Sequence, residues 1–341
     1  HPAASGDVLM LYSNITADNV AARNTLFNQT AGVLLALANA PAVPQKTLLE
    51  LVRLLGTFFQ REPFLPPETT LPISDWLVGA AQAANDPELV TALLRVLSYV
   101  ADTPAVAKYM PVLLPLSLKF VLSPNKDVLT GALALIGSLT AESSEATTLL
   151  AQQGVLQRLC TITTDHPDLS QSCFWIASNF CAEKSPVVQK EVVTSGIVKA
   201  ALFEVVISDF SKVRHEAEWV VVNCLYTFNG PLLEMLVAMD SFYEAIAVVV
   251  RGNYHDYDLL SFAVAGIKRL LEKGLIDDND TFANNLMQEG IQNDLINLLV
   301  LHRHTDPQGE KGVPDEMHKD LIDIVDNYFE CYDADDEGMN Y

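Results

Sequence analysis

Similar helical segments recur along this chain at nearly constant spacing, and this recurrence limits the fold more than any other feature. Seven such segments follow one another in steps of 43, 42, 39, 41, 44 and 46 residues, centred on Asn14, Thr57, Tyr99, Ser138, Asn179, Asn223 and Arg269. Apolar residues return at helical spacing nearly from end to end, whereas strand-like alternation is scarce. Such a period predicts stacked helical repeats, each of which buries its apolar side against its neighbours.

A glycine keeps the same spacing, each time just before an apolar helix. Gly154 and Gly196 are 42 residues apart, Gly32 lies about three repeats earlier and Gly290 about two repeats later. A glycine between a short first helix and a longer second helix favours armadillo repeats over HEAT repeats of similar length. We therefore predict an all-α, right-handed superhelical armadillo-repeat solenoid of about eight repeats over residues 1–330. The first repeat is incomplete, because residues 7–17 already read as its third helix.

The net charge of the chain limits the kinds of partner that it can bind. The net charge is -22, from 21 basic and 43 acidic residues, which argues against binding to nucleic acid or to an anionic membrane and favours a basic partner. No apolar run is long enough to span a bilayer. Residues 331–341 are predicted to form an acidic, disordered tail.

Residues that would carry catalysis or bind a metal are not arranged for either purpose. The five cysteines are scattered and odd in number, which predicts neither a disulfide framework nor a metal knuckle. His302, His304 and His318 match no closed zinc pattern and are read as part of a solvated loop. No nucleophile elbow, P-loop or HExxH motif occurs, so we expect no enzyme activity, no cofactor and no metal.

Two segments place a tryptophan and an asparagine four residues apart on the helix face opposite the apolar stripe. The pairs are Trp175 with Asn179 and Trp219 with Asn223. An indole attracts the stem and charge of a lysine or arginine, and a carboxamide can bond both the C=O and the N–H of an extended peptide. The alternative is that the indoles pack between adjacent helices; the asparagine beside each one favours the ligand.

The same stretches resemble the importin-alpha family, the armadillo adaptors that bind nuclear localisation signals. The most similar stretches are Cys173-Phe-Trp-Ile-Ala-Ser-Asn179 and Arg214-His-Glu-Ala-Glu-Trp219-Val-Val-Val-Asn223, which resemble the seventh and eighth repeats. Weaker similarity around Asn14, Tyr99 and Tyr328 extends the resemblance over nearly the whole chain, from the third repeat of the family to the tenth.

The resemblance implies two peptide sites. A site like the minor groove of the family would consist of Trp175, Ser178, Asn179, Glu216, Trp219 and Asn223. A site like the major groove would retain Asn14, Asp18, Tyr99 and Asp102. The tryptophans expected in the major groove are replaced by Met10, Arg53 and Arg95. An arginine there removes the stacking surface and repels a basic ligand, so this second site is predicted to be eroded.

From the resemblance we expect a nuclear import adaptor that shuttles between cytoplasm and nucleus. It would bind Lys/Arg-rich signals in an extended conformation, mainly at the minor-like site. In the family, an N-terminal basic segment, which this sequence does not contain, links cargo to importin-beta, and an export receptor contacts the last repeats. The alternative is an armadillo scaffold that has lost signal binding, which Arg53 and Arg95 favour.

Overall fold

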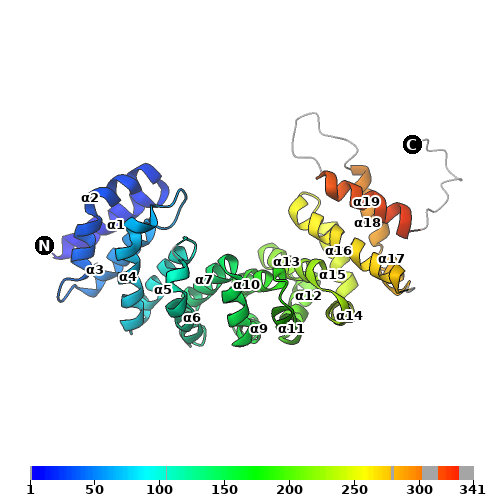
Figure 1. The fold of residues 1–341 in the computed structure, drawn as a ribbon, viewed down its shortest axis with the longest axis horizontal. Coiled ribbons are helices and arrows are strands. Elements are labelled where there is room, and N and C mark those ends of the chain that lie inside the picture. The colour runs from blue at the N-terminus through cyan, green and yellow to red at the C-terminus, as the bar shows by residue number, and fades with distance from the viewer. Residues whose placement is uncertain (1, 105, 278–279, 302–313, 330–341) are drawn as a thin grey trace. The chain divides into compact units, whose positions relative to one another are not determined.

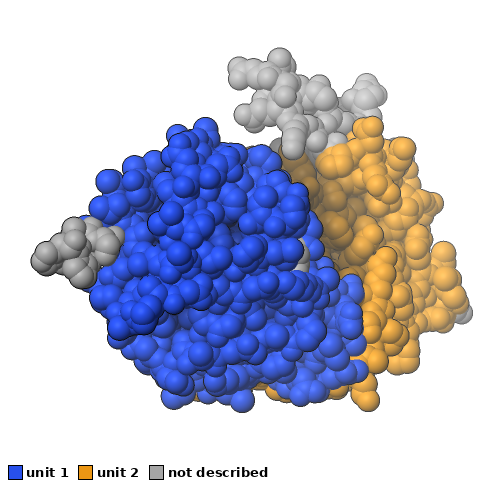
Figure 2. All heavy atoms as spheres, turned by 60° about the vertical axis from the view of Figure 1, so that its left-hand side comes forward, with its two compact units in different colours: residues 1–155 blue, residues 156–341 orange. Residues whose placement is uncertain are grey.

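The computed structural model describes residues 2–104, 106–277, 280–301 and 314–329, and these residues form helices joined by short turns, without a β-strand among them (Figure 1). The chain divides into two compact units, His1–Val155 and Leu156–Tyr341, which Figure 2 colours separately. We call them unit 1 and unit 2. The predicted tail, residues 331–341, and the histidines at positions 302 and 304 lie outside the described residues.

Unit 1 contains one long helix, then three pairs of helices and a short helix. Its helices are α1 (Pro2–Asp18), α2 (Val20–Ala38), α3 (Gln45–Thr57), α4 (Pro67–Ala83), α5 (Pro87–Ala101), α6 (Val106–Phe120), α7 (Lys126–Glu142) and α8 (Ser144–Gln152). The second helix of each pair packs on its counterpart in the next pair, so that α1, α3, α5 and α7 form one stacked row.

Unit 2 contains triplets rather than pairs. It begins with α9 (Val155–Asp165), a 3-10 turn η1 (Pro167–Leu169) and α10 (Ser170–Ala182). Three triplets follow, namely α11 (Pro186–Thr194), α12 (Ile197–Ile207) and α13 (Ser211–Thr227); α14 (Gly230–Val237), α15 (Phe242–Gly252) and α16 (Tyr257–Ile276); α17 (Thr281–Gln288), α18 (Ile291–Leu301) and α19 (Asp315–Tyr328). The last helices of the repeats, α10, α13, α16 and α19, form a stacked row of their own.

These two rows confirm the predicted periodicity. The seven segments used to measure it lie on α1, α3, α5, α7, α10, α13 and α16, which we call the row helices together with α19. Within each unit, consecutive row helices lie side by side (Figure 1). Glycines allow close packing in both rows: a Cβ on Gly56 of α3 would lie 2.6 Å from the side chain of Val96 of α5, and one on Gly266 of α16 would lie 2.7 Å from that of Leu225 of α13.

The glycines mark the first helix junction only in the triplets. Gly154, Gly196 and Gly290 have φ angles of 75°, 88° and 78°, in the left-handed region that glycine adopts without steric cost. Ser241 takes the same place between α14 and α15, with a φ of 63°. The expectation of a junction at Gly32 is wrong: this residue lies inside α2, which runs unbroken from Val20 to Ala38. Pairs have no short first helix, so no junction is needed there.

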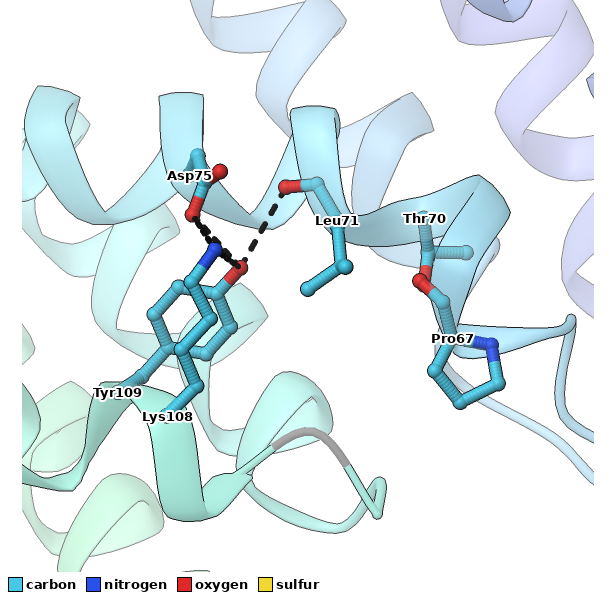
Figure 3. A network of polar contacts seen from close by, with 6 residues as sticks. All are labelled: Pro67, Thr70, Leu71, Asp75, Lys108 and Tyr109. Carbon is cyan, nitrogen blue, oxygen red and sulfur yellow. Dashed lines mark hydrogen bonds and ion pairs between the residues drawn. The ribbon is translucent and has the colours of Figure 1, made fainter.

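A polar network joins the outer helices of two neighbouring pairs in unit 1 (Figure 3). The Oδ1 atom of Asp75 on α4 accepts hydrogen bonds from Lys108 Nζ at 2.6 Å and from the Tyr109 hydroxyl at 2.8 Å, both on α6. The hydrogen bond from Lys108 lowers the pKa of Asp75. The carboxylate therefore stays ionised and connects α4 to α6, while the apolar faces bury the core between them.

Candidate functional site

The predicted faces of α10 are confirmed by burial. Leu169, just before the helix, and Cys173, Ile176, Ala177 and Phe180 on it are all buried, as the apolar stripe requires. Trp175, on the opposite side of the helix, keeps 39% of its surface exposed. The apolar stripe of α10 is complete without this indole, so the Trp175 ring faces solvent.

The α13 helix repeats the arrangement with one difference. Ala217, Val220, Val221 and Cys224 are buried, whereas Val213, predicted to share their stripe, is only half-buried near the start of the helix. Trp219 and Asn223 are half-buried on the other side. Because α10 packs on α13, the two Trp/Asn pairs lie on neighbouring row helices.

One hydrogen bond joins Asn223 to the backbone of α10, next to Asn179. The side-chain Nδ2 of Asn223 donates to the carbonyl oxygen of Ser178 at 3.1 Å. This bond orients the carboxamide and leaves its Oδ1 atom available to accept a hydrogen bond from a ligand. The Ser178 hydroxyl is buried and donates to the carbonyl of Trp175 at 2.7 Å, so this residue contributes its backbone oxygen rather than its side chain.

Trp219 is oriented by two side chains that sequence reasoning missed. Its Nε1 donates to His215 Nε2 at 3.3 Å, and its ring packs against Phe262 of α16 with centroids 5.9 Å apart. Phe262 also meets Tyr226 edge to face at 4.8 Å. The packing alternative is therefore partly realised for Trp219, and Trp175 is the more open of the two indoles. Phe262 lies 46 residues after Glu216, which is one repeat, so the spacing could have predicted that it occupies the equivalent position on the next row helix.

One carboxylate lies one turn from Trp219 on α13, and two more flank its partner His215. Glu216, one turn before Trp219, is half-buried, and burial raises its pKa although His215 and a hydrogen bond to Gln171 oppose the shift. Burial also raises the pKa of Glu218, which lies 3.6 Å from the Nδ1 atom of His215. Asp256 approaches the other nitrogen of His215 at 3.7 Å. Glu218 is buried and also lies 3.7 Å from Arg214, so a cationic ligand would meet mainly the half-buried Glu216 and Asp256.

In unit 1 the predicted acidic residue is already paired within the chain. Asp18 accepts from Arg61 Nη2 at 2.7 Å, although both side chains are largely exposed. Arg61 belongs to the loop between α3 and α4, whose carbonyls at Arg61 and Pro63 are held by the buried guanidinium of Arg23. Asp18 is therefore paired with a cation from the loop of the following repeat.

The other predicted residues of unit 1 belong to one groove or lie beside it. Asn14, Tyr99, Arg53 and Arg95 line a groove of about 700 Å³ between α1, α3 and α5. The Tyr99 hydroxyl accepts from Gln60 at 3.1 Å. Partial burial raises the pKa of Asp102, and a hydrogen bond to Ser138 of the next row helix opposes this.

The two arginines lie at the predicted shelf positions of that groove. Arg53 bonds Glu50 at 2.6 Å and lies 3.7 Å from Glu88, so its charge is balanced by neighbouring carboxylates. Arg95 is exposed and, among the residues that the structure describes, forms no ion pair. An added cation would meet no unpaired carboxylate beside Arg53 and direct repulsion at Arg95.

The described residues offer neither a metal site nor a membrane-spanning helix. No group of three or more His, Cys, Asp or Glu side chains in this part of the chain is placed to hold a metal ion. None of the helices described is both long and apolar enough to cross a membrane. Four of the five cysteines are described, and all four are free thiols.

The chain resembles solved structures in fold. An engineered protein superposes with a TM-score of 0.70 at 16% identity, over 94% of this chain and 74% of that one. A computationally designed armadillo repeat protein for modular peptide recognition reaches 0.57 at 17% identity, over 73% and 97% of the two chains. A designed armadillo repeat protein in complex with the peptide (KR)4 reaches 0.54 at 16% identity, over 69% and 96%.

No protein-family model and no curated protein matches the sequence. The structural likeness, together with the stacked row helices, defines an all-α protein with an armadillo-repeat solenoid fold. Proteins with this fold include armadillo repeat proteins designed for modular peptide recognition.

Proposed function

We propose that this protein is a non-enzymatic adaptor that binds Lys/Arg-rich peptide segments in an extended conformation along α10 and α13. The observation that supports this most is the hydrogen bond between Asn223 and the Ser178 carbonyl, which holds two Trp/Asn pairs in register on adjacent helices. A designed armadillo repeat protein of similar fold is described in complex with (KR)4, which is consistent with a basic ligand.

The finer proposal is nuclear import. The resemblance to importin-alpha around Trp175 and Trp219 suggests that the basic segments are nuclear localisation signals and that the protein shuttles between cytoplasm and nucleus. By the same resemblance, importin-beta would receive the cargo complex, and an export receptor would return the protein through its last repeats. A pull-down of full-length protein with importin-beta and a signal-bearing cargo, against cargo whose lysines are changed to serine, tests this level separately.

The armadillo scaffold is the second candidate. It is favoured by unit 1, where Asp18 and Arg53 are paired within the chain and no tryptophan lies in the groove. A scaffold without signal binding would show no affinity for basic peptides in either unit.

A titration with a short basic peptide distinguishes the adaptor from the scaffold. Trp76→Phe removes the one tryptophan of unit 1, so that fluorescence reports only Trp175 and Trp219. We expect salt-sensitive binding, and a loss of roughly 30-fold in affinity in the Trp175→Ala, Trp219→Ala variant, because each indole contributes about 1 kcal/mol of cation–π attraction. The double variant lacks these reporters, so calorimetry measures it and the parent together. A peptide of the same length with serine for lysine is the control, and equal affinity in all combinations would favour the scaffold.

A further inference from the structure

The repeat after Trp219 lacks an indole, and a cavity opens where it would lie. The step of 46 residues that relates Asn223 to Arg269 places Ala265 at the position of Trp219. Next to Ala265 is a cavity of about 210 Å³ between α13, α16 and α19, lined chiefly by Tyr226, Phe262, Ala265, Glu316, Met317 and Asp320. Its volume is that of a large side chain, not of a whole ligand.

The walls of this cavity are aromatic and apolar. Phe262 keeps 38% of its surface exposed although it packs edge to face on Tyr226. Met317 is buried beneath them, with its sulfur 3.6 Å from the Ser261 hydroxyl, which donates to the carbonyl of Tyr257 at 2.6 Å. Such walls suit the methylene stem of a long side chain, which can bury its carbons while its head group stays near water.

The rim of the cavity is acidic. Lys268 is shared between Asp320 and Asp323, with both distances 2.9 Å, so this group keeps one net negative charge. Glu316 is exposed and has no ion pair among the residues described. The other nearby cation, Arg269, lies over the Tyr226 ring at 5.9 Å and bonds Asn229. A new cation entering between Phe262 and Glu316 would therefore meet an aromatic ring and a free carboxylate.

We propose that this cavity binds the side chain of a lysine or arginine, two or three residues along the same extended peptide from the one that stacks on Trp219. The spacing follows from roughly 8–10 Å between packed helices and about 3.3 Å per extended residue. Phe262 belongs to both places, since it packs on Trp219 on one side and lines the cavity on the other. This subsite rests on the proposed function and extends it from two repeats to three.

The test compares peptides that differ only in an extension. The base peptide carries a short Lys-Arg core, and longer ones add three residues with a central lysine, or a central serine, at one end or the other. Calorimetry on the intact chain should show one lysine extension binding about threefold to tenfold more tightly than its serine counterpart. Glu316→Gln and Ala265→Leu, the first removing the carboxylate and the second filling the cavity, should each abolish this gain without weakening the base peptide.

The control is Glu244→Gln, which removes an exposed carboxylate on α15, away from the cavity. Equal affinity of lysine and serine extensions at both ends, or a gain that survives both variants, would overturn the subsite while leaving the proposed function intact. If the base peptide itself does not bind, the proposed function and the subsite fail together. Thermal unfolding of each variant confirms that it is folded, and Glu316→Gln, at an exposed position, is not expected to disturb packing.

Discussion

Units 1 and 2 stack their row helices in the same way, yet they present opposite chemistry at equivalent positions. One turn before the reference position, α10 and α13 of unit 2 carry Trp175 and Trp219, whereas α1, α3 and α5 of unit 1 carry Met10, Arg53 and Arg95. The same position is an alanine on α7 and on α16. In unit 1 the acidic partners are neutralised from within, as in the pair of Arg61 with Asp18. The repeat fold therefore presents a surface of stacked row helices in both units, and a few side chains decide whether that surface accepts a cation.

The units also differ in the helices that precede the row helix of each repeat. Triplets in unit 2 need a left-handed residue between the first two helices, and Gly196, Ser241 and Gly290 provide it. Pairs in unit 1 replace the first two helices by one continuous helix, as α2 shows. The stacking of the row helices is preserved in both cases, because it depends on the last helix of each repeat and not on the ones before it.

The largest expected effect is on the loop that supplies Arg61 in unit 1. Arg23 is 1% exposed and its guanidinium donates to two loop carbonyls, while burial lowers its pKa. Arg23→Leu removes both hydrogen bonds from this buried, charged group to the loop and should lower the free energy of unfolding by about 3 kcal/mol. Urea unfolding followed by circular dichroism measures it. Arg95→Leu, at an exposed arginine, is the matched control and should change stability by less than about 0.5 kcal/mol; equal effects would show that the loop is not held as described.

The second prediction concerns a variant in which the groove of unit 1 is given tryptophans like those of unit 2. In the Trp175→Ala, Trp219→Ala background, Arg53→Trp with Arg95→Trp should restore affinity for a basic peptide by about tenfold, because two indoles replace two repelling cations. Arg53→Met with Arg95→Met is the control, since it removes the charges without adding rings. Calorimetry measures all three. Equal gains in affinity from tryptophan and methionine would mean that charge repulsion alone prevents binding in unit 1. No gain from either would contradict the proposed difference between the units.

The third prediction concerns the one triplet that lacks a glycine at its junction. Ser241→Gly should stabilise the protein by about 1 kcal/mol, because glycine takes a φ of 63° without the steric cost that a Cβ adds. Gly196→Ser is the mirror control and should destabilise by a similar amount; its Cβ would meet Cys160 at an ordinary 3.4 Å, so the backbone angle is the cause. Thermal unfolding measures both. A stabilisation by Gly196→Ser would contradict the left-handed junction.

The smallest effect is a pH dependence in unit 2. Burial raises the pKa of Glu216 above its ordinary value of 4.5, so the carboxylate loses its charge earlier as the pH falls. Basic-peptide affinity should therefore weaken by a few fold as the pH drops from 7 through that raised pKa. Because the folded pKa is the higher one, the same group stabilises the fold below the unfolded pKa and loses that contribution as the pH rises through the folded pKa.

Glu216→Gln separates this group from its neighbours. It should give the low-pH affinity at every pH and remove the corresponding part of the pH profile. It should also stabilise the protein slightly at pH 7, where the buried charge is costly. A pH profile unchanged by Glu216→Gln would assign the dependence to another group.

Periodicity predicted most of the fold. The seven reference positions all fall on row helices, and Trp175 lies outside the buried stripe of α10 as its spacing requires. What periodicity could not predict are contacts between side chains 40 or more residues apart. Arg61 reaches Asp18 from a loop, and Phe262 reaches Trp219 from the next repeat. The predicted junction at Gly32 failed for a related reason: the repeat spacing gives the position of a residue but does not show whether the helix breaks there.

The central claim is that a basic peptide binds at the two indoles of unit 2 and not in the groove of unit 1. The chain has three tryptophans, so an NMR spectrum of the 15N-labelled protein contains three indole N–H signals. Titration with a basic peptide should shift the signals of Trp175 and Trp219, reversibly with salt, and leave that of Trp76 unchanged. Shifts confined to Trp76, or no shift of the other two at saturating peptide, would contradict the account.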